Sequence, residues 1–585
     1  MNFERIHKIY YVLFILLVVL TVFYSALFAG ILSVDDQRLV TDLFNLDSWS
    51  LKGVFIRGGG YYYRPISRLT FLADKFLSGP HESFMHLENI LLHATSCILV
   101  FFISSRLARL RGLESPAVPL VAALLFGLHP ITTEPVNWIS GRTDLLAAVF
   151  LLTSLLLLLR HLASNGMYSL AAACCSFFLA TLAKETALFW FPAVLFFVHC
   201  YRREHADVST GIKRRSGHGS PLVYVVLSLV PLAYFVLRHA ALSRKDQGIS
   251  IAVRGAVAGS FDVMNKLRIT LKVFGFYLKK LILPLPLNFA IVQVSNWYVP
   301  VGIAGIVFCC YLLYRRGTLG ALQLIGISII TPALLVPLGR MAWTPLAERY
   351  LYMPAAFVVM SLVILAAERL RGYNYSQMAV VIPLLLLITG SGYTTYRRNI
   401  VWQSNLTLFQ DCVEQSPDCP AAWNELARAL QNEGRTEEAM RIFRKNTLES
   451  SDKYRIVTTT NQAAAMADAH DVTGAIALLL NLHYTRSEPF YDYYLRQLLY
   501  FYGLLEQKQT SQKELHAIRM KQIDLTSELQ SVTGDPYLLY RLGQLYLSVK
   551  DERNAATYFA KAFEKSPDNA YYKEPARKLA ARLSR

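Results

Sequence analysis

The sequence has little charge for its length. Only 17% of its 585 residues are Asp, Glu, Lys or Arg, whereas a soluble globular chain usually carries about 25%. Acidic residues are the scarcer sign, with 41 against 59 Lys and Arg, for a formal net charge of +18. Nucleic-acid binding would call for basic patches interleaved with aromatics, and the polar stretches contain none. The composition therefore excludes an ordinary soluble protein and argues against a nucleic-acid partner.

Cysteine is also scarce, with eight residues, and no compact metal-ligand motif is present. We therefore assign no metal ligands from the sequence. Six cysteines stand in apolar runs, where they are expected to be buried thiols. Cys412 and Cys419 lie in polar sequence, seven residues apart. A disulfide between them is expected if this region faces an oxidising compartment, and two separate thiols otherwise.

Long apolar runs are what the sequence has in abundance. Hydrophobic residues make up 54% of the chain, and runs of about 16–21 residues, long enough to cross a bilayer, follow one another. The first run is too long for the core of a signal peptide and is expected to be a retained helix. We expect eleven spans, near 10–31, 87–104, 117–131, 144–160, 167–183, 186–201, 221–238, 298–314, 318–338, 350–367 and 377–393.

Positive charge predicts the orientation of these spans. With the N-terminus inside, arginine-rich connections such as "SSRLARLRGLE" and "ERLRGYN" face the cytoplasm, as the positive-inside rule requires. The first external loop, 31–86, and the connections rich in acids and aromatics then face out. The stretch 271–290, which contains two lysines and two prolines, is expected to be re-entrant or interfacial. Eleven crossings also place the C-terminal region outside.

From residue 399 the sequence turns polar and helical, and a repeat appears. The segments 420–452 and 535–569 share a helix, a polar turn, a small residue (Ala439, Ala556) and an aromatic (Phe443, Phe559). This pattern matches the tetratricopeptide repeat of about 34 residues, which binds partners or acts as a spacer.

The predicted fold class is therefore all-α. A polytopic membrane helix bundle is expected over 1–398. A tetratricopeptide-repeat α-solenoid is expected over 399–585.

Two adjacent carboxylates, Asp35 and Asp36, directly follow the first apolar run in "ILSVDDQRLV". One interpretation makes them the N-cap and first-turn acid of the next helix. The other makes them a catalytic centre. The two interpretations are compatible, because one aspartate can cap the helix and thereby orient the side chain of the other. Since Asp35 is the better placed cap, Asp36 is the favoured base.

Other polar and charged residues lie near the predicted spans, where burial in a membrane costs free energy. They gather on the predicted outer side, together with Asp35 and Asp36. Arg64 and Arg68 share a helix face and suit phosphate, but anchoring at headgroups fits them equally. His86, Asn89 and His93 form one stripe, which either lines a cavity or packs in hydrogen bonds. The remaining candidates for binding the substrate or its phosphate are His129, Glu134, Arg142, Asp144, Lys184, Glu185, Glu348 and Arg349.

Simpler interpretations exist for some of these residues, since Arg142 with Asp144 could cap a helix and Lys184 with Glu185 could form a local ion pair. Taken together, carboxylates beside Arg and Lys side chains suit a site that binds a lipid-linked phosphosugar donor. The cations would stabilise the phosphate as the sugar departs, and a carboxylate would take the proton of an acceptor hydroxyl.

The motifs "VDDQ", "YYRPISRLTFLAD", "HLENILLHA", "LHPITTEPVNWISGRTDLLA", "AKE" and "AERYLYMP" occur in this order, followed by repeats. In this they resemble the transmembrane, tetratricopeptide-repeat-containing O-mannosyltransferases and their bacterial relatives, which are GT-C glycosyltransferases. The resemblance implies an inverting transfer of sugar from a polyprenyl-phosphate donor to a protein or glycan hydroxyl on the extracytoplasmic side. Asp35 and Asp36 match the family's first-loop acids, and a divalent metal stays open.

The repeat array is shorter than in eukaryotic relatives, so a bacterial inner-membrane protein with periplasmic repeats is expected. The alternative function is a non-catalytic membrane scaffold whose repeats assemble a glycan or envelope complex. A transporter is disfavoured because the polar residues stay on one side of the membrane.

Overall fold

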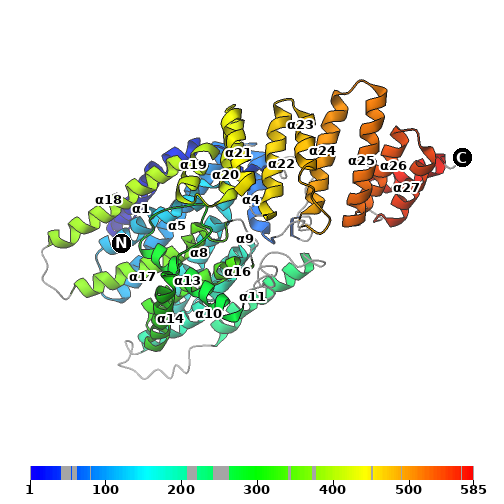
Figure 1. The fold of residues 1–585 in the computed structure, drawn as a ribbon. Coiled ribbons are helices and arrows are strands. Elements are labelled where there is room, and N and C mark those ends of the chain that lie inside the picture. Colours follow the sequence, from blue (N-terminus) through cyan, green and yellow to red (C-terminus); the bar gives the residue numbers. More distant parts are fainter. Residues whose placement is uncertain are drawn as a thin grey trace. The chain divides into compact units, whose positions relative to one another are not determined.

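The computed structural model of the chain is built from helices (Figure 1). It describes residues 2–37, 39–40, 54–55, 62–79, 81–206, 221–241, 262–339, 344–371, 377–449, 452–488, 490–567 and 570–583. Within these ranges there is no strand, and the one β-type pairing is an isolated antiparallel bridge between Ile291 and Leu346. The all-α prediction is confirmed. Residues 41–53 and 56–61 of the predicted first external loop lie outside the described ranges.

The chain forms two compact units, Met1–Ser416 and Pro417–Arg585. The sequence placed the boundary at 398, whereas the first unit continues to Ser416. Its first helices are α1 (Asn2–Val22), η1 (Tyr24–Phe28), α4 (Pro65–Leu77), α5 (Glu82–Leu110), α6 (Ala117–Gly127), η2 (Pro130–Thr132), α7 (Thr133–Asn137), η3 (Ile139–Gly141), α8 (Arg142–Ser164), α9 (Met167–Ala183), η4 (Glu185–Phe189) and α10 (Trp190–Ala206). The others are α11 (Leu222–Ala241), α13 (Val263–Ile282), α14 (Tyr298–Arg315), α15 (Thr318–Ile330), η5 (Thr331–Leu334), α16 (Val336–Gly339), η6 (Glu348–Leu351), α17 (Tyr352–Leu370), α18 (Gln377–Val401) and α19 (Asn405–Gln415).

Apolar helices long enough to cross a membrane dominate the first unit. Among the described residues there are seven, or eight if Ala117–Gly127 and Pro130–Asn137, bent by 50°, count as one. The seven are Glu82–Leu110, Ile139–Ser164, Leu222–Ala241, Tyr298–Arg315, Thr318–Leu338, Glu348–Leu370 and Met378–Val401. This unit makes the chain a membrane protein.

Three of the eleven predicted spans are not among these long helices. They correspond to the apolar helices Lys8–Val22 and Met167–Ala183 and to α10, which has 17 residues. Short 3-10 helices, η1 and η4, take up the rest of two of these apolar runs. Helix α13, from the predicted interfacial stretch, is not among the candidate spans.

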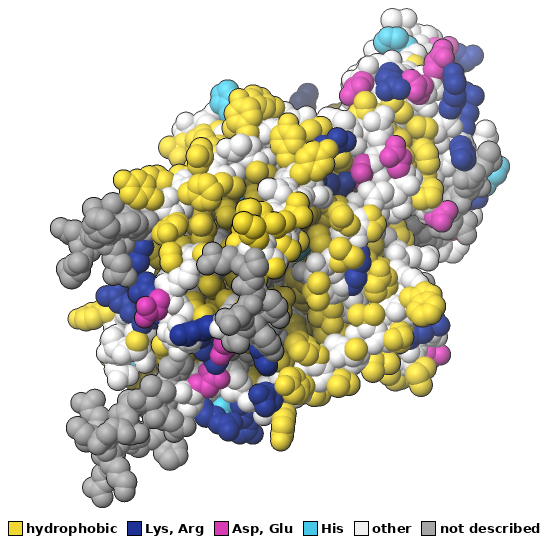
Figure 2. All heavy atoms as spheres, turned by 90° about the vertical axis from the view of Figure 1, so that its left-hand side faces the viewer, with side chains coloured by type: hydrophobic (Ala, Val, Ile, Leu, Met, Phe, Trp, Pro, Cys, Tyr) yellow, Lys and Arg dark blue, Asp and Glu magenta, His cyan; other side chains and the backbone are white. Residues whose placement is uncertain are grey.

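Helix α8 lies at the centre of this bundle, in contact with α5, α9 and α17. Leu145, Leu151, Leu155 and Leu158 are fully buried, as expected for a helix that is apolar on every side. Helix α18 is the opposite case. It exposes apolar side chains, among them Val381, Ile382, Leu385, Leu386 and Leu387. The face of the unit that carries α18 is largely hydrophobic (Figure 2), as expected of a surface that meets lipid.

The second unit consists of α20 (Pro420–Asn432), α21 (Thr436–Glu449), α22 (Asp452–Asp468), α23 (Val472–Leu480), α24 (Tyr491–Lys508), α25 (Gln512–Thr533), α26 (Pro536–Ser548), α27 (Glu552–Lys565) and α28 (Lys573–Leu583). Consecutive helices pack as antiparallel neighbours, so the predicted repeat solenoid is confirmed. In the last repeat the buried small residue is Ala555, not Ala556 as expected. Ala555 lies four residues before Phe559, the same spacing as between Ala439 and Phe443. Gly543 faces the Phe559 ring, and a Cβ there would come within 2.7 Å of it.

Candidate functional site

The two first-loop aspartates have different environments. Asp36 is fully buried, whereas Asp35 is exposed. The Oδ1 atom of Asp36 accepts hydrogen bonds from the backbone N–H of Ser140 at 2.8 Å and from its hydroxyl at 2.5 Å. These two hydrogen bonds therefore hold the "VDDQ" segment against η3, which directly precedes α8. The carbonyl of Asp35 accepts the N–H of Leu39 at 2.9 Å, so a helical turn does begin here.

Burial raises the pKa of Asp36 to about 7, against the hydrogen bonds from Ser140, and the nearby charge of Asp35 adds to the rise. Between pH 3.8 and about 7, Asp36 therefore holds its proton more tightly in the folded protein than in the unfolded chain. The contribution of Asp36 to the free energy of unfolding falls as the pH rises through this window.

We expect Asp36→Asn to remove this loss of stability, because the amide oxygen can still accept from Ser140 but carries no charge. The measurement is the Tm of the detergent-solubilised protein at pH 5 and pH 8. Asp35→Asn is the matched control, since its carboxylate is already exposed. An equal fall in Tm for the wild type and Asp36→Asn would contradict the prediction.

Three ion pairs meet near the start of α8, and we call these six residues the ionic cluster. Arg64 binds Glu185 through two hydrogen bonds, of 2.8 and 2.6 Å. Lys184 Nζ lies 2.6 and 2.5 Å from the two carboxylate oxygens of Asp144. Arg349 donates its backbone N–H and Nη1 to Glu134, at 2.9 and 2.6 Å. The ionic cluster thus joins α4, α7, α8, η4 and η6, and its three positive and three negative charges balance.

Electrostatic interactions connect the three pairs. Lys184 interacts with both Arg64 and Arg349, and Asp144 interacts with the same two arginines. Burial lowers the pKa of Lys184 although Asp144 opposes this. Burial acts to raise the pKa of Glu185, but the charge and hydrogen bonds of Arg64 outweigh it and lower that pKa. The Glu185–Arg64 pair is therefore ionised.

Two aromatic residues border the ionic cluster. The Tyr350 ring lies 5.1 Å from the Arg349 guanidinium and 5.8 Å from Lys184 Nζ. The Tyr62 ring lies 4.2 Å from the Arg64 guanidinium, and the charges of Asp35, Arg64 and Glu185 all act on Tyr62. The charge of the exposed Asp35 thus acts on the tyrosine that borders Arg64. The side chains of Arg64 and Arg349 keep 22% and 15% exposure.

Arg142 belongs to a separate buried network. Its Nη1 lies 2.6 Å from Asp74 Oδ2 and 2.8 Å from Glu88 Oε2. It also donates to Asn89 Oδ1 and to the Met85 carbonyl, both at 3.2 Å. Asp144, the partner suggested by the sequence, binds Lys184 instead. Arg142 thus joins α4, α5 and α8, and has no surface left for a substrate.

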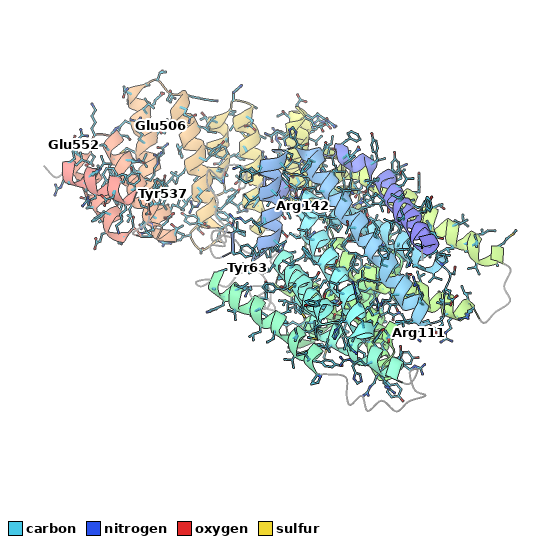
Figure 3. All side chains as sticks on the ribbon, turned by 180° about the vertical axis from the view of Figure 1, so that it is seen from behind. Tyr63, Arg111, Arg142, Glu506, Tyr537 and Glu552 are labelled. Carbon is cyan, nitrogen blue, oxygen red and sulfur yellow. The ribbon has the colours of Figure 1, made fainter. Side chains whose placement is uncertain are left out.

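The opposite end of α5 carries another ion pair, in which Arg111 lies 3.0 Å from Glu204. Arg111 and Arg142 are far apart in the bundle, near the two ends of α5 (Figure 3). A helix of 29 residues is about 43 Å long. The ionic cluster, which contains Asp144 of α8, therefore lies toward one end of the bundle and the arginine-rich C-terminal end of α5 toward the other.

The predicted stripe of His86, Asn89 and His93 is packed inside the bundle. His93 Nδ1 lies 2.9 Å from the Tyr352 hydroxyl and Nε2 lies 3.0 Å from the Gly127 carbonyl. Asn89 donates to the Trp138 carbonyl at 2.9 Å, and His86 is fully buried. His129 accepts the N–H of Ile131 at 3.3 Å and so caps η2. These contacts are typical of structural polar residues.

Three further predictions concern Arg68, metal and the disulfide. Arg68 is half-buried on α4 and forms no ion pair within the described ranges. No group of three or more His, Cys, Asp or Glu that could hold a metal occurs in the part of the chain that the structure describes. Cys412 in α19 and Cys419, the N-cap residue of α20, are both buried free thiols in the structure. The disulfide between them therefore stays a prediction for an oxidising compartment.

Sequence reasoning missed several partners in these networks. Asp74 and Glu88 hold Arg142, Ser140 holds Asp36, and Lys280 lies 2.5 Å from Glu348. Lys280 is 2% exposed, although lysine is almost never fully buried unless it is paired. The signal for a buried ion pair was a lysine inside the apolar stretch "GFYLKKLILPLP". The sequence predicts this stretch to be re-entrant or interfacial.

Comparison with known proteins gives matches in both units. A tetratricopeptide-repeat family model matches residues 420–445 and 536–569. Human protein O-mannosyl-transferase TMTC3 is 23% identical over 416 residues, which is 65% of this chain and 44% of the relative. Protein O-mannosyl-transferase F38B6.6 of Caenorhabditis elegans is 23% identical over 439 residues, 70% of this chain and 57% of the relative.

A shorter match is closer in sequence. Mouse protein O-mannosyl-transferase TMTC4 is 38% identical over 126 residues, 20% of this chain and 17% of the relative. The chain spans about half the length of the first curated relatives it matches. Among solved structures, yeast Tom70 is 14% identical, covers 80% of this chain and 92% of its own, and has a TM-score of 0.26, too low to bear on the fold.

Proposed function

We propose, on the premise that this chain belongs to the family of membrane-spanning, repeat-bearing protein O-mannosyl-transferases, that it is a glycosyltransferase of the GT-C type. Its donor would be a sugar linked to a polyprenyl phosphate, and its acceptor a protein or glycan hydroxyl. The proposal is supported by an exposed carboxylate, Asp35, whose charge acts on Tyr62, the ring that lies 4.2 Å from Arg64. In the ionic cluster, Arg64 and Arg349 keep exposed surface.

In this proposal Asp35 is the general base and Asp36 the residue that positions it. The acceptor hydroxyl gives its proton to Asp35, and its oxygen forms the new bond to the anomeric carbon of the sugar. The bond from that carbon to the phosphate oxygen breaks, and the polyprenyl phosphate leaves with the bonding electrons. Attack from the face opposite the phosphate inverts the anomeric centre. This assignment reverses the roles favoured from the sequence, because burial and the two hydrogen bonds from Ser140 fix Asp36.

Arg64 and Arg349 would bind the phosphate and stabilise its negative charge as the sugar leaves. Arg64 already binds both oxygens of a carboxylate through its guanidinium, the geometry that also suits phosphate. Arg349 binds one oxygen of Glu134 through Nη1 and the other through its backbone N–H. Glu185 and Glu134 then hold the two arginines in place before the donor arrives, so less is lost in ordering them. Lys184 is 6% exposed and doubly bonded to Asp144, so it contributes charge rather than direct contact.

The site would face the extracytoplasmic side, with the arginines at the C-terminal end of α5 on the cytoplasmic side, as the positive-inside rule favours. The acceptor would approach from that side, and the repeats, which follow α19, would bind the acceptor or a partner protein. The expected setting is the inner membrane of a bacterium, with the repeats in the periplasm.

The experiment that tests the function incubates the purified full-length protein with a panel of polyprenyl-phosphate sugars and hydroxyl-bearing peptides. We expect release of polyprenyl phosphate with at least one sugar, and a glycosylated product. The scaffold alternative, which the repeats alone would also fit, predicts no release with any donor. Absence of turnover across the panel would therefore favour the scaffold.

Arg64→Met and Arg68→Met form a pair of variants that tests the phosphate assignment. The structure brings only Arg64 to the ionic cluster, so Arg64→Met is expected to raise the KM for the donor by about 10- to 100-fold, the value of a charged hydrogen bond. Arg68→Met is expected to change it far less. Steady-state kinetics with a fixed acceptor is the measurement, and an equal loss in both variants would contradict the assignment.

A further inference from the structure

Residues 286–291, between α13 and α14, form a segment that we call the strap. Leu287, Phe289, Ala290 and Ile291 are buried, although the strap belongs to no helix. A connection normally runs over the surface and exposes its side chains. The buried side chains of the strap therefore indicate that other segments cover it.

One side of the strap contacts the chain that leads into η6. The N–H of Asn288 donates to Glu348 Oε1 at 3.1 Å, and the same oxygen accepts from Lys280 Nζ at 2.5 Å. Lys280 also donates to the Pro286 carbonyl. Ile291 forms the antiparallel bridge with Leu346. The strap and Lys280 thus hold residues 346–348, which directly precede Arg349 of the ionic cluster.

The ring of Phe289 adds a second contact toward the ionic cluster. It lies edge-on to Trp138, with ring centroids 6.3 Å apart, and the Trp138 ring lies 4.9 Å from the Arg349 guanidinium. The strap therefore reaches Arg349 by two routes, one through Glu348 and one through Trp138.

The other side of the strap contacts the end of the first unit. Asn288 Nδ2 donates to Ser416 Oγ at 2.8 Å, and Ser416 Oγ donates to the Ala290 carbonyl at 2.8 Å. Gln415 Nε2 donates to the Leu287 carbonyl at 2.6 Å. Ser416 is the last residue of this unit and is followed directly by Pro417, where the repeats begin.

We propose that Lys280 and the strap position Arg349, and that they tie its position to the chain end that carries the repeats. Lys280 neutralises the buried Glu348 carboxylate, and the shared oxygen of that carboxylate holds the strap in place. Loss of either the Lys280 charge or the Ser416 hydrogen bonds then loosens residues 344–352. The inference rests on the proposed function for its kinetic consequence, but the loosening itself needs no substrate.

The test uses hydrogen–deuterium exchange of the full-length protein in detergent, without donor or acceptor. Ser416→Ala removes two hydrogen bonds of the strap and is expected to speed exchange in residues 344–352 by about tenfold, since one buried hydrogen bond is worth close to that factor. Lys280→Met is expected to have the larger effect, and Lys280→Arg, which keeps the charge, to recover most of the protection.

A neighbouring residue provides the control. Ser295→Ala removes an exposed hydroxyl that accepts the Trp297 N–H at 3.2 Å. This variant is expected to leave exchange in 344–352 unchanged. Unchanged exchange in Ser416→Ala would overturn the link to the chain end, and this holds even if Lys280→Met fails to fold.

Kinetics separates a positioning role from a purely structural one. With an active donor, Ser416→Ala and Lys280→Met are expected to raise the KM for the donor several-fold more than they lower kcat, because Arg349 would be displaced rather than removed. Faster exchange with wild-type kinetics would overturn the positioning role. If the wild type turns over no donor, the proposed function fails, while the exchange experiment still decides whether the strap holds residues 344–352.

Discussion

Asp35→Asn is expected to lower the rate of sugar transfer by about 10²- to 10⁴-fold, the contribution of a positioned general base. The amide keeps the shape of the side chain but cannot take a proton from the acceptor. Asp35 is exposed, so folding and membrane insertion should be unchanged. The measurement is kcat with the donor found in the panel, alongside the elution profile of the purified variant.

Asp36→Asn is the matched comparison, because it makes the same chemical change one residue away. The amide oxygen can still accept from Ser140, so the segment stays attached and the loss of rate should be much smaller. Ser140→Ala, which removes the hydroxyl bond of 2.5 Å to Asp36, should also lower the rate through a displaced Asp35. If Asp36→Asn were the more damaging of the two aspartate variants, the base would be Asp36. If both variants kept full activity, neither would be the base.

The sequence predicted the architecture well because the features that define it are local. Apolar length identified the helices of the bundle, and the spacing of Ala439 and Phe443 identified the repeats. What it could not predict is where an apolar run stops being one straight helix. The run 117–131 turns by 50° after Gly127, and hydropathy does not register such a turn. In the described part of the chain this turn accounts for one predicted span that is not a long helix, and three others correspond to apolar helices of 17 residues or fewer.

The residues of the ionic cluster could be predicted from the sequence, but the partners in their ion pairs could not. Arg142 and Asp144 are two apart on α8, and residues at this spacing do not face each other on a helix. Arg142 consequently binds Asp74 and Glu88, and Asp144 binds Lys184. Lysine beside a membrane is usually taken as a side chain that reaches for water, which is why Lys280 was overlooked. Pairings of this kind depend on contacts between distant segments, which one sequence does not contain.

Arg142→Met is expected to destabilise the protein by about 3–5 kcal/mol, the cost of breaking a buried ion pair by removing one partner. Arg142 is 1% exposed and Asp74 is fully buried, so no water can replace the lost guanidinium. The side chains of Asp74 and Glu88 would be left facing each other without a cation. The measurement is the Tm of the purified protein in detergent, read from the fraction that remains monodisperse after heating.

Arg435→Met is the control, because Arg435 forms an exposed ion pair with Glu438 on α21, 2.7 Å long, and such pairs contribute little. We expect no measurable change in Tm for it. Arg142→Met combined with Asp74→Leu should recover part of the loss, since an apolar replacement of a buried pair is often tolerated. A fall in Tm no larger than that of Arg435→Met would contradict the structural role of Arg142 and reopen its assignment as a phosphate ligand.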